Sequence, residues 1–131
     1  MRYEAEKSAD MTPQAGKALK RAPERRQRRY PRYRTEFPVT LTLLSNEGHQ
    51  CLDGHCRDLS VAGIGVLIAE ELTLGGVVAL TFTLPGSAQP WELRAVLRHR
   101  RGYHYGFEFL SLSDQQGEAL RGYLPSLERA D

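Results

Sequence analysis

The sequence predicts a mainly β protein: a closed or nearly closed six-stranded antiparallel barrel, with one C-terminal helix and a flexible basic N-terminal arm. Three observations lead to this prediction. Short segments of alternating apolar and polar residues recur between turn-forming glycine, proline and asparagine residues, as in small antiparallel barrels. After residue 112 the apolar spacing changes from strand-like to helix-like. An arginine-rich stretch stands immediately before the first alternating segment.

The predicted strands follow one another at short intervals. The first begins at Phe37 and alternates apolar residues with threonines. A turn at 46–48 leads into a returning strand over 50–59, in which we expect a bulge at Asp53-Gly54. Four more strands are expected, over 65–69, 77–84, 91–100 and 103–110. Strands of this length and spacing suit a small closed sheet.

A helix is predicted after the last strand. Four apolar residues recur there at helical spacing: Leu120, Tyr123, Leu124 and Leu127. Ser113, followed three residues later by Gln116, is typical of a capping box at a helix N-terminus. Pro125 is expected to end or kink the helix because it has no backbone N–H to donate. We expect this helix to cover one mouth of the barrel.

Length and composition limit the classes of protein to consider. At 131 residues the chain is large enough for one domain and a tail. We expect residues 1–24 to form a largely disordered tail, because they lack a sustained apolar period, and residues 25–127 to form the domain with its arm. No apolar run has the length of a membrane span, and the charged N-terminus lacks a signal-peptide core. We therefore expect a cytoplasmic protein without a membrane partner.

Positive charge is concentrated in front of the predicted barrel. The net charge is +2, yet residues 17–34 hold nine of the 18 lysines and arginines and a single acidic residue. Residues 35–131 hold seven basic and twelve acidic residues, a net charge of −5. A nucleic-acid-binding domain usually spreads positive charge over its docking face. This distribution therefore argues against nucleic acid as the partner.

Residues 25–34 form the first of two candidate binding clusters. Six of these ten residues are arginine, and Pro31 disfavours a helix, so we expect the stretch to lie extended. Arg28 and Arg32 would then share one face. A guanidinium is planar, permanently charged and suited to bidentate contacts with phosphate and with the edge of guanine. The stretch therefore predicts contact with a flat, anionic ligand.

The second cluster is Asp58-Leu59-Ser60-Val61-Ala62-Gly63. Asp58 and Ser60 lie two apart in a predicted strand and so point the same way. An ionised carboxylate accepts hydrogen bonds and a hydroxyl both donates and accepts, which fits the Watson–Crick edge of guanine. Gly63 would permit a positive φ or a close approach of the backbone to a ligand. The alternative is a structural turn at a strand end, in which Asp58 caps local amides and Gly63 only turns the chain.

Together the two clusters resemble the PilZ domain family. The resemblance rests on Arg28-x-x-x-Arg32, on Asp58-x-Ser60-x-x-Gly63 and on the closing Gly106-Phe107-Glu108-Phe109, and it covers residues 25 to about 124. Ala62 stands where many relatives have a second glycine. Arg25-x-x-x-Arg29 has the same arginine spacing. We prefer Arg28 and Arg32 because that pair directly precedes the first strand.

The resemblance implies a receptor for cyclic di-GMP. In that family the motif arginines hold phosphates and guanine edges, and the aspartate, serine and glycine complete the pocket. These roles fall on Arg28, Arg32, Asp58, Ser60 and Gly63. We expect the arm to close over the ligand and to relay the change to an unidentified protein partner. Two alternatives stay open: a barrel that binds single-stranded nucleic acid through its basic arm, and an interaction module that binds no nucleotide.

Five further residues have candidate roles in ligand binding or in the core. Arg29, Arg98 and Arg100 are further candidates for ligand binding, and for the last two a solvated hairpin end is the alternative. Trp91 and Tyr105 are expected in the core or at its rim.

No cofactor, metal site or enzymatic activity is expected. His49, Cys51, His55 and Cys56 lie close together, but Cys51 and Cys56 stand an odd number apart and face opposite sides of a strand. The same geometry argues against a disulfide. No spacing suggests a nucleophile with its base, a phosphate-binding glycine loop or paired catalytic carboxylates.

Overall fold

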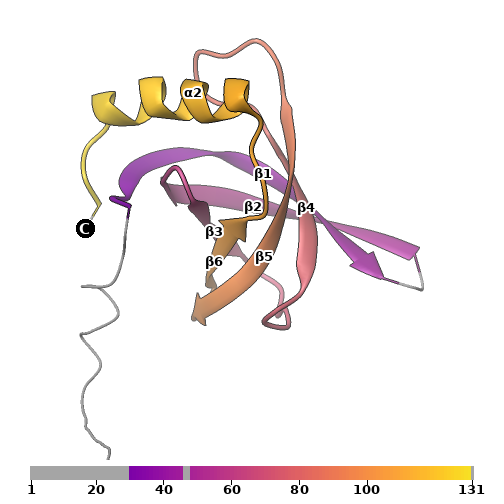
Figure 1. Ribbon diagram of the computed structural model, residues 1–131. Helices are drawn as coiled ribbons and strands as arrows, with labels where there is room; N and C mark the ends of the chain where they lie inside the picture. Colours follow the sequence, from indigo (N-terminus) through magenta and orange to yellow (C-terminus); the bar gives the residue numbers. More distant parts are fainter. Residues whose placement is uncertain (1–29, 46–47, 131) are drawn as a thin grey trace, which may run out of the picture.

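Six strands form a closed antiparallel barrel in the order β1-β2-β3-β6-β5-β4 (Figure 1). The computed structural model describes residues 30–45 and 48–130. Its strands are β1 (Tyr33–Ser45), β2 (Gly48–Leu59), β3 (Gly63–Ile68), β4 (Val77–Phe82), β5 (Trp91–Arg101) and β6 (His104–Phe109). The predicted barrel is thus confirmed. The predicted tail and residues 25–29 of the predicted arm lie outside the described residues, so their disorder and flexibility stay predictions.

One apolar core fills the barrel because every strand points apolar residues into it. On β1 these are Phe37, Val39 and Leu41, each at most 5% exposed. On β3 and β6, Ile64, Val66, Tyr105 and Phe107 point inward in the same way. The residues between them therefore face outward.

Tyr105 lies in the core with a satisfied hydroxyl. The side chain is fully buried, and its hydroxyl donates to the backbone oxygen of Glu70 (2.8 Å) and accepts from the backbone nitrogen of Leu72 (3.1 Å). These bonds tie the segment after β3 to β6. Trp91 is half-buried and packs against the core. The predicted core or rim position of both aromatic residues is confirmed.

β1 begins at Tyr33, four residues before the predicted start. Its first residues are held by the C-terminal segment as well as by β2. The backbone nitrogen of Arg34 donates to the oxygen of Glu128 (2.8 Å), and the nitrogen of Ala130 donates to the oxygen of Arg32 (2.8 Å). Local alternation did not reveal this start because the partner lies at the other end of the chain.

The predicted bulge at Asp53-Gly54 is wrong. The pairing of β2 with β1 is regular there. The irregularity lies between Cys56 and Asp58, where β2 pairs with β3. Cys56 and Leu59 are both fully buried although they stand three residues apart, and strict alternation would place them on opposite faces. The irregularity shifts the phase of β2 directly beside the second cluster.

One end of the barrel is covered by α2 (Asp114–Tyr123) (Figure 1). The short 3₁₀ helix η1 (Leu124–Ser126) follows α2, and its Leu124 belongs to the core. The predicted capping box is present: Ser113 Oγ accepts from the backbone of Gln116, and Gln116 Oε1 accepts from the backbone of Ser113, both at 3.0 Å. Leu120 of α2 packs into the barrel core. Within the described residues, no helix is long and apolar enough to cross a membrane.

Candidate functional site

A row of paired residues crosses the outer face of five strands. Its members are neighbours in strand register from β1 through β2, β3 and β6 to β5: Arg34, Asp58, Gly65, Gly106 and His99. The two glycines stand side by side on β3 and β6, so this part of the outer surface has no side chains of its own. Neighbouring side chains lie against it instead. The Asp58 carboxylate lies against Gly65 and the His99 ring against Gly106.

Asp58 is the meeting point of this surface. Its Oδ1 accepts a hydrogen bond from Arg32 Nη1 (2.7 Å), and its Oδ2 lies 3.1 Å from His104 Nε2. The Asp58 and Arg32 side chains are only 15% and 17% exposed. Burial raises the pKa of Asp58, but hydrogen bonds from His104 and Arg32, with the positive charge of Arg32, outweigh burial and hold that pKa below its usual value. Asp58 is therefore an ionised acceptor at neutral pH.

The 60–63 segment is a tight turn organised by Ser60. The Ser60 hydroxyl oxygen accepts from the backbone nitrogens of Ala62 and Gly63, both at 3.1 Å. The backbone nitrogen of Ser60 donates to the oxygen of Gly63 (2.9 Å), and the Ser60 side chain is buried. A structural turn is thus present here, and the capping of local amides that the alternative gave to Asp58 comes from Ser60.

Gly63 serves close packing rather than unusual backbone torsion. Its φ is not positive, which excludes one of the two roles that the sequence allowed for it. A Cβ atom here would lie 2.3 Å from the backbone oxygen of Phe107. Gly63 therefore lets β3 approach β6 closely beside the turn.

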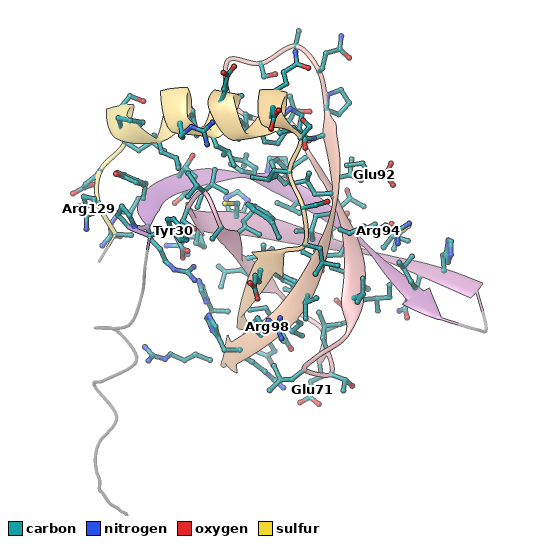
Figure 2. All side chains as sticks on the ribbon, viewed as in Figure 1. Tyr30, Glu71, Glu92, Arg94, Arg98 and Arg129 are labelled. Atoms are coloured by element: carbon teal, nitrogen blue, oxygen red, sulfur yellow. The ribbon has the colours of Figure 1, made fainter. Side chains whose placement is uncertain are left out.

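A cavity of about 240 Å³ opens where these features meet. It is lined by Tyr30 and Arg32 before β1, by the 60–63 turn, and by Arg98, His99 and Glu108 on β5 and β6. Figure 2 shows Tyr30 where the described chain enters the barrel and Arg98 on β5. Of the five predicted motif residues, three line this one cavity: Arg32, Ser60 and Gly63. Asp58 is hydrogen-bonded to Arg32 at the edge of the cavity.

A larger cavity of about 510 Å³ lies elsewhere, between the 84–91 segment and α2. Its lining includes Trp91, Tyr123 and several amide and hydroxyl side chains, but no charged one. The larger cavity therefore has no positive side chain to neutralise the charge of a phosphate group. The smaller cavity has the arginines and is the better candidate for an anionic ligand.

The sequence matches the family described as "PilZ domain" over residues 26–125. The chain belongs to the PilZ domain family. Among curated proteins, none shows significant sequence similarity to it.

Solved structures share the PilZ fold with this chain. The PilZ domain of Escherichia coli YcgR with c-di-GMP is 21% identical, with a TM-score of 0.59 over 77% of this chain and 91% of that one. The PilZ domain of CeSA from a cellulose-synthesizing bacterium is 20% identical, with a TM-score of 0.55 over 72% and 95% of the two chains. The Bacillus subtilis inhibitor of motility, MotI/DgrA, is 21% identical, with a TM-score of 0.61 over 76% of this chain, which spans 50% of that protein.

The remaining predicted arginines of this PilZ domain have different positions. Arg28 and Arg29 lie outside the described residues. Arg98 lines the cavity, and its Nε donates to Glu108 Oε1 (2.6 Å). Arg100 does not line it: its Nε donates to the backbone oxygen of Gly102 (2.6 Å) in the hairpin turn. The two candidates on β5 are therefore not equivalent.

His104 was missed by the sequence analysis. It is the first residue of β6, two residues before Gly106, and it reaches Asp58 although 46 residues separate them. The signal was present in the alternation of the predicted last strand, which puts His104, Gly106 and Glu108 on the outward face. What the sequence did not show is that Asp58 lies beside this face.

The two cysteines have separate environments. Cys51 is exposed and Cys56 is buried, as their odd spacing indicated. Burial and the negative charge of Asp58 raise the pKa of the Cys56 thiol far above its usual value. In the part of the chain that the structure describes, no group of three or more histidine, cysteine, aspartate or glutamate residues is placed to hold a metal ion.

Proposed function

We propose that this PilZ domain is a receptor for cyclic di-GMP that binds the ligand in the cavity beside Arg32. The observation that carries the proposal is the meeting of the two motif halves at one cavity: Arg32 Nη1 lies 2.7 Å from Asp58 Oδ1, and both Arg32 and the 60–63 turn line the cavity. The presence of c-di-GMP in the similar YcgR structure supports the same ligand.

The chemistry of the cavity suits part of this ligand. Cyclic di-GMP has two phosphates and two guanines. Arg32 offers a charged, planar fork to a phosphate or to the O6 and N7 atoms of guanine. An ionised carboxylate has about four acceptor positions. Asp58 can therefore hold Arg32 and His104 and still accept from the N–H groups of a guanine edge. Ser60 holds the 60–63 turn through its hydrogen bonds to Ala62 and Gly63. Gly63 adds no side chain to the cavity wall.

The size of the cavity supports closure by the arm. Sites that enclose a drug-sized ligand measure about 300–1,000 Å³, and this one measures about 240 Å³. The rest of the ligand would lie against residues before Tyr30, where Arg28 and Arg29 stand. Limited proteolysis tests this: cleavage within residues 21–29 should slow when cyclic di-GMP is added. Unchanged cleavage at saturating ligand would argue against closure, and against an arm that signals to a protein partner.

Isothermal titration of the full chain tests the proposed receptor. We expect saturable binding of cyclic di-GMP, and much weaker binding of GTP and of a single-stranded DNA oligonucleotide. Arg94→Ala is a matched control, because Arg94 is exposed on β5 and lies well away from Tyr30 in Figure 2. Binding of the DNA that matches that of cyclic di-GMP and fades with salt would favour a nucleic-acid module. No binding of any nucleotide would favour an interaction module.

A further inference from the structure

We infer that His104 is a positioning residue of the ligand site, which holds the Asp58 carboxylate so that Asp58 holds the Arg32 guanidinium at the cavity. The inference rests on the proposed function. It adds to the site a residue that lies outside both motifs and does not line the cavity.

Three side chains from separate parts of the chain form a continuous series. His104 Nε2 on β6 lies 3.1 Å from Asp58 Oδ2 on β2, and Asp58 Oδ1 lies 2.7 Å from Arg32 Nη1 before β1. Each carboxylate oxygen therefore has a different partner. The plane of the carboxylate is fixed by both contacts together, because a single contact leaves it free to turn about its terminal bond.

The donor in the first contact follows from charge. Asp58 is ionised, and an ionised carboxylate only accepts hydrogen bonds. His104 Nε2 therefore has a proton and donates it, whether the imidazole is neutral or charged. Among the described residues, one other titratable group besides Arg32 and His104 bonds to Asp58: the Cys56 thiol donates to its backbone oxygen (3.4 Å), not to its carboxylate.

The absence of a side chain at Gly65 leaves room for the contact between His104 and Asp58. A Cβ atom at Gly65 would lie 2.6 Å from Asp58 Oδ2 and 2.7 Å from His104 Nε2. Both groups thus lie directly on the backbone of β3, in space that any side chain would take. The His104 imidazole is about one-third exposed, at 32%, so part of the ring faces solvent while Nε2 lies against Asp58.

Two variants of similar size isolate the donor. His104→Gln keeps an N–H group near the position of Nε2, whereas His104→Leu removes it. Cyclic di-GMP affinity should fall about tenfold in His104→Leu, the low end for a hydrogen bond to a charged group because the effect is indirect. It should stay within about threefold of the wild type in His104→Gln.

The double substitution distinguishes positioning from a contact of its own. In an Asp58→Ala background, His104→Leu should have no further effect on affinity, since the residue it acts through is gone. Equal losses in both backgrounds, or equal affinities of the Leu and Gln variants, would overturn the inference and leave the proposed function intact. A wild-type protein that does not bind cyclic di-GMP would reject the proposed function, and the inference with it. The inference is supported if His104→Leu lowers the affinity, His104→Gln does not, and the loss occurs only when Asp58 is present.

Discussion

Arg32 and Asp58 stand 26 residues apart and are joined by a hydrogen-bonded ion pair of 2.7 Å between Nη1 and Oδ1. Both side chains are more than four-fifths buried, so the pair is shielded from water more than a surface pair is. The arginine that we assign to the ligand is thus already oriented by the second motif. One contact links the two halves of the proposed site.

Arg32→Lys should therefore fail to restore binding. A lysine supplies the charge, but it lacks the planar fork that holds Asp58 with one nitrogen and reaches the ligand with another. We expect the free energy of cyclic di-GMP binding to weaken by roughly 1.5–3 kcal/mol in both Arg32→Lys and Arg32→Ala, the scale of a hydrogen bond to a charged group. Isothermal titration of both variants beside Arg94→Ala measures this. Near-normal binding by Arg32→Lys would mean that only charge matters at this position.

The low pKa of Asp58 predicts how the stability of the ligand-free protein depends on pH. Because that pKa is lowered in the folded state, the folded protein binds fewer protons than the unfolded one. The contribution of Asp58 to stability is complete above the usual aspartate pKa of about 3.9, and it is lost as pH falls through the folded-state pKa.

Asp58→Asn tests this pH dependence. The variant should be less stable than the wild type at pH 7, and the difference should narrow as the pH drops below about 4. Urea unfolding of both proteins between pH 7 and pH 3 gives the two free energies of unfolding. A difference that stays constant over this range would show that the charge of Asp58 does not stabilise the fold.

The sequence was sufficient to predict the barrel and its covering helix, because these depend on local patterns. Alternation along β1 and the Ser113–Gln116 box are visible in short windows, and both features are present in the structure. The motifs also brought Arg32 and Asp58 to attention together.

What the sequence did not show depends on contacts between distant segments. The early start of β1 depends on backbone hydrogen bonds with the C-terminal residues. The change in which residues of β2 face the core depends on its irregular pairing with β3. The role of His104 needs the register that puts β6 beside Asp58 across Gly65. Such pairings cannot be predicted from a short window of sequence, because the residues around one partner do not identify the other.

Gly63→Ala should destabilise the barrel itself. The added Cβ would lie 2.3 Å from the backbone oxygen of Phe107, and backbone cannot rotate aside as a side chain can. We expect a loss of about 1–3 kcal/mol in the free energy of unfolding, as for overpacked cores. Gly122→Ala is the matched control: a Cβ there meets nothing within 4 Å, and alanine in α2 should stabilise by about 0.5–1 kcal/mol. Thermal melting that places both variants on the same side of the wild type would contradict this account.

The choice between the two arginine spacings is also open to a direct test. Arg32 belongs to the pair that we prefer, and its contact with Asp58 supports that register over Arg25 with Arg29. Arg28→Ala should therefore lower cyclic di-GMP affinity strongly and at every salt concentration, because it removes a charge-assisted contact with the ligand.

Arg25→Ala should cost much less, and its effect should fade as salt is added, because a distant charge acts only through a screened field. Titrations of Arg25→Ala, Arg28→Ala and Arg29→Ala at low and moderate salt decide the matter. If Arg25→Ala and Arg29→Ala abolish binding and Arg28→Ala does not, the motif is the earlier pair, and Arg32 holds Asp58 without holding the ligand. If all three lose affinity equally and only at low salt, the arginines attract anions without forming a specific site.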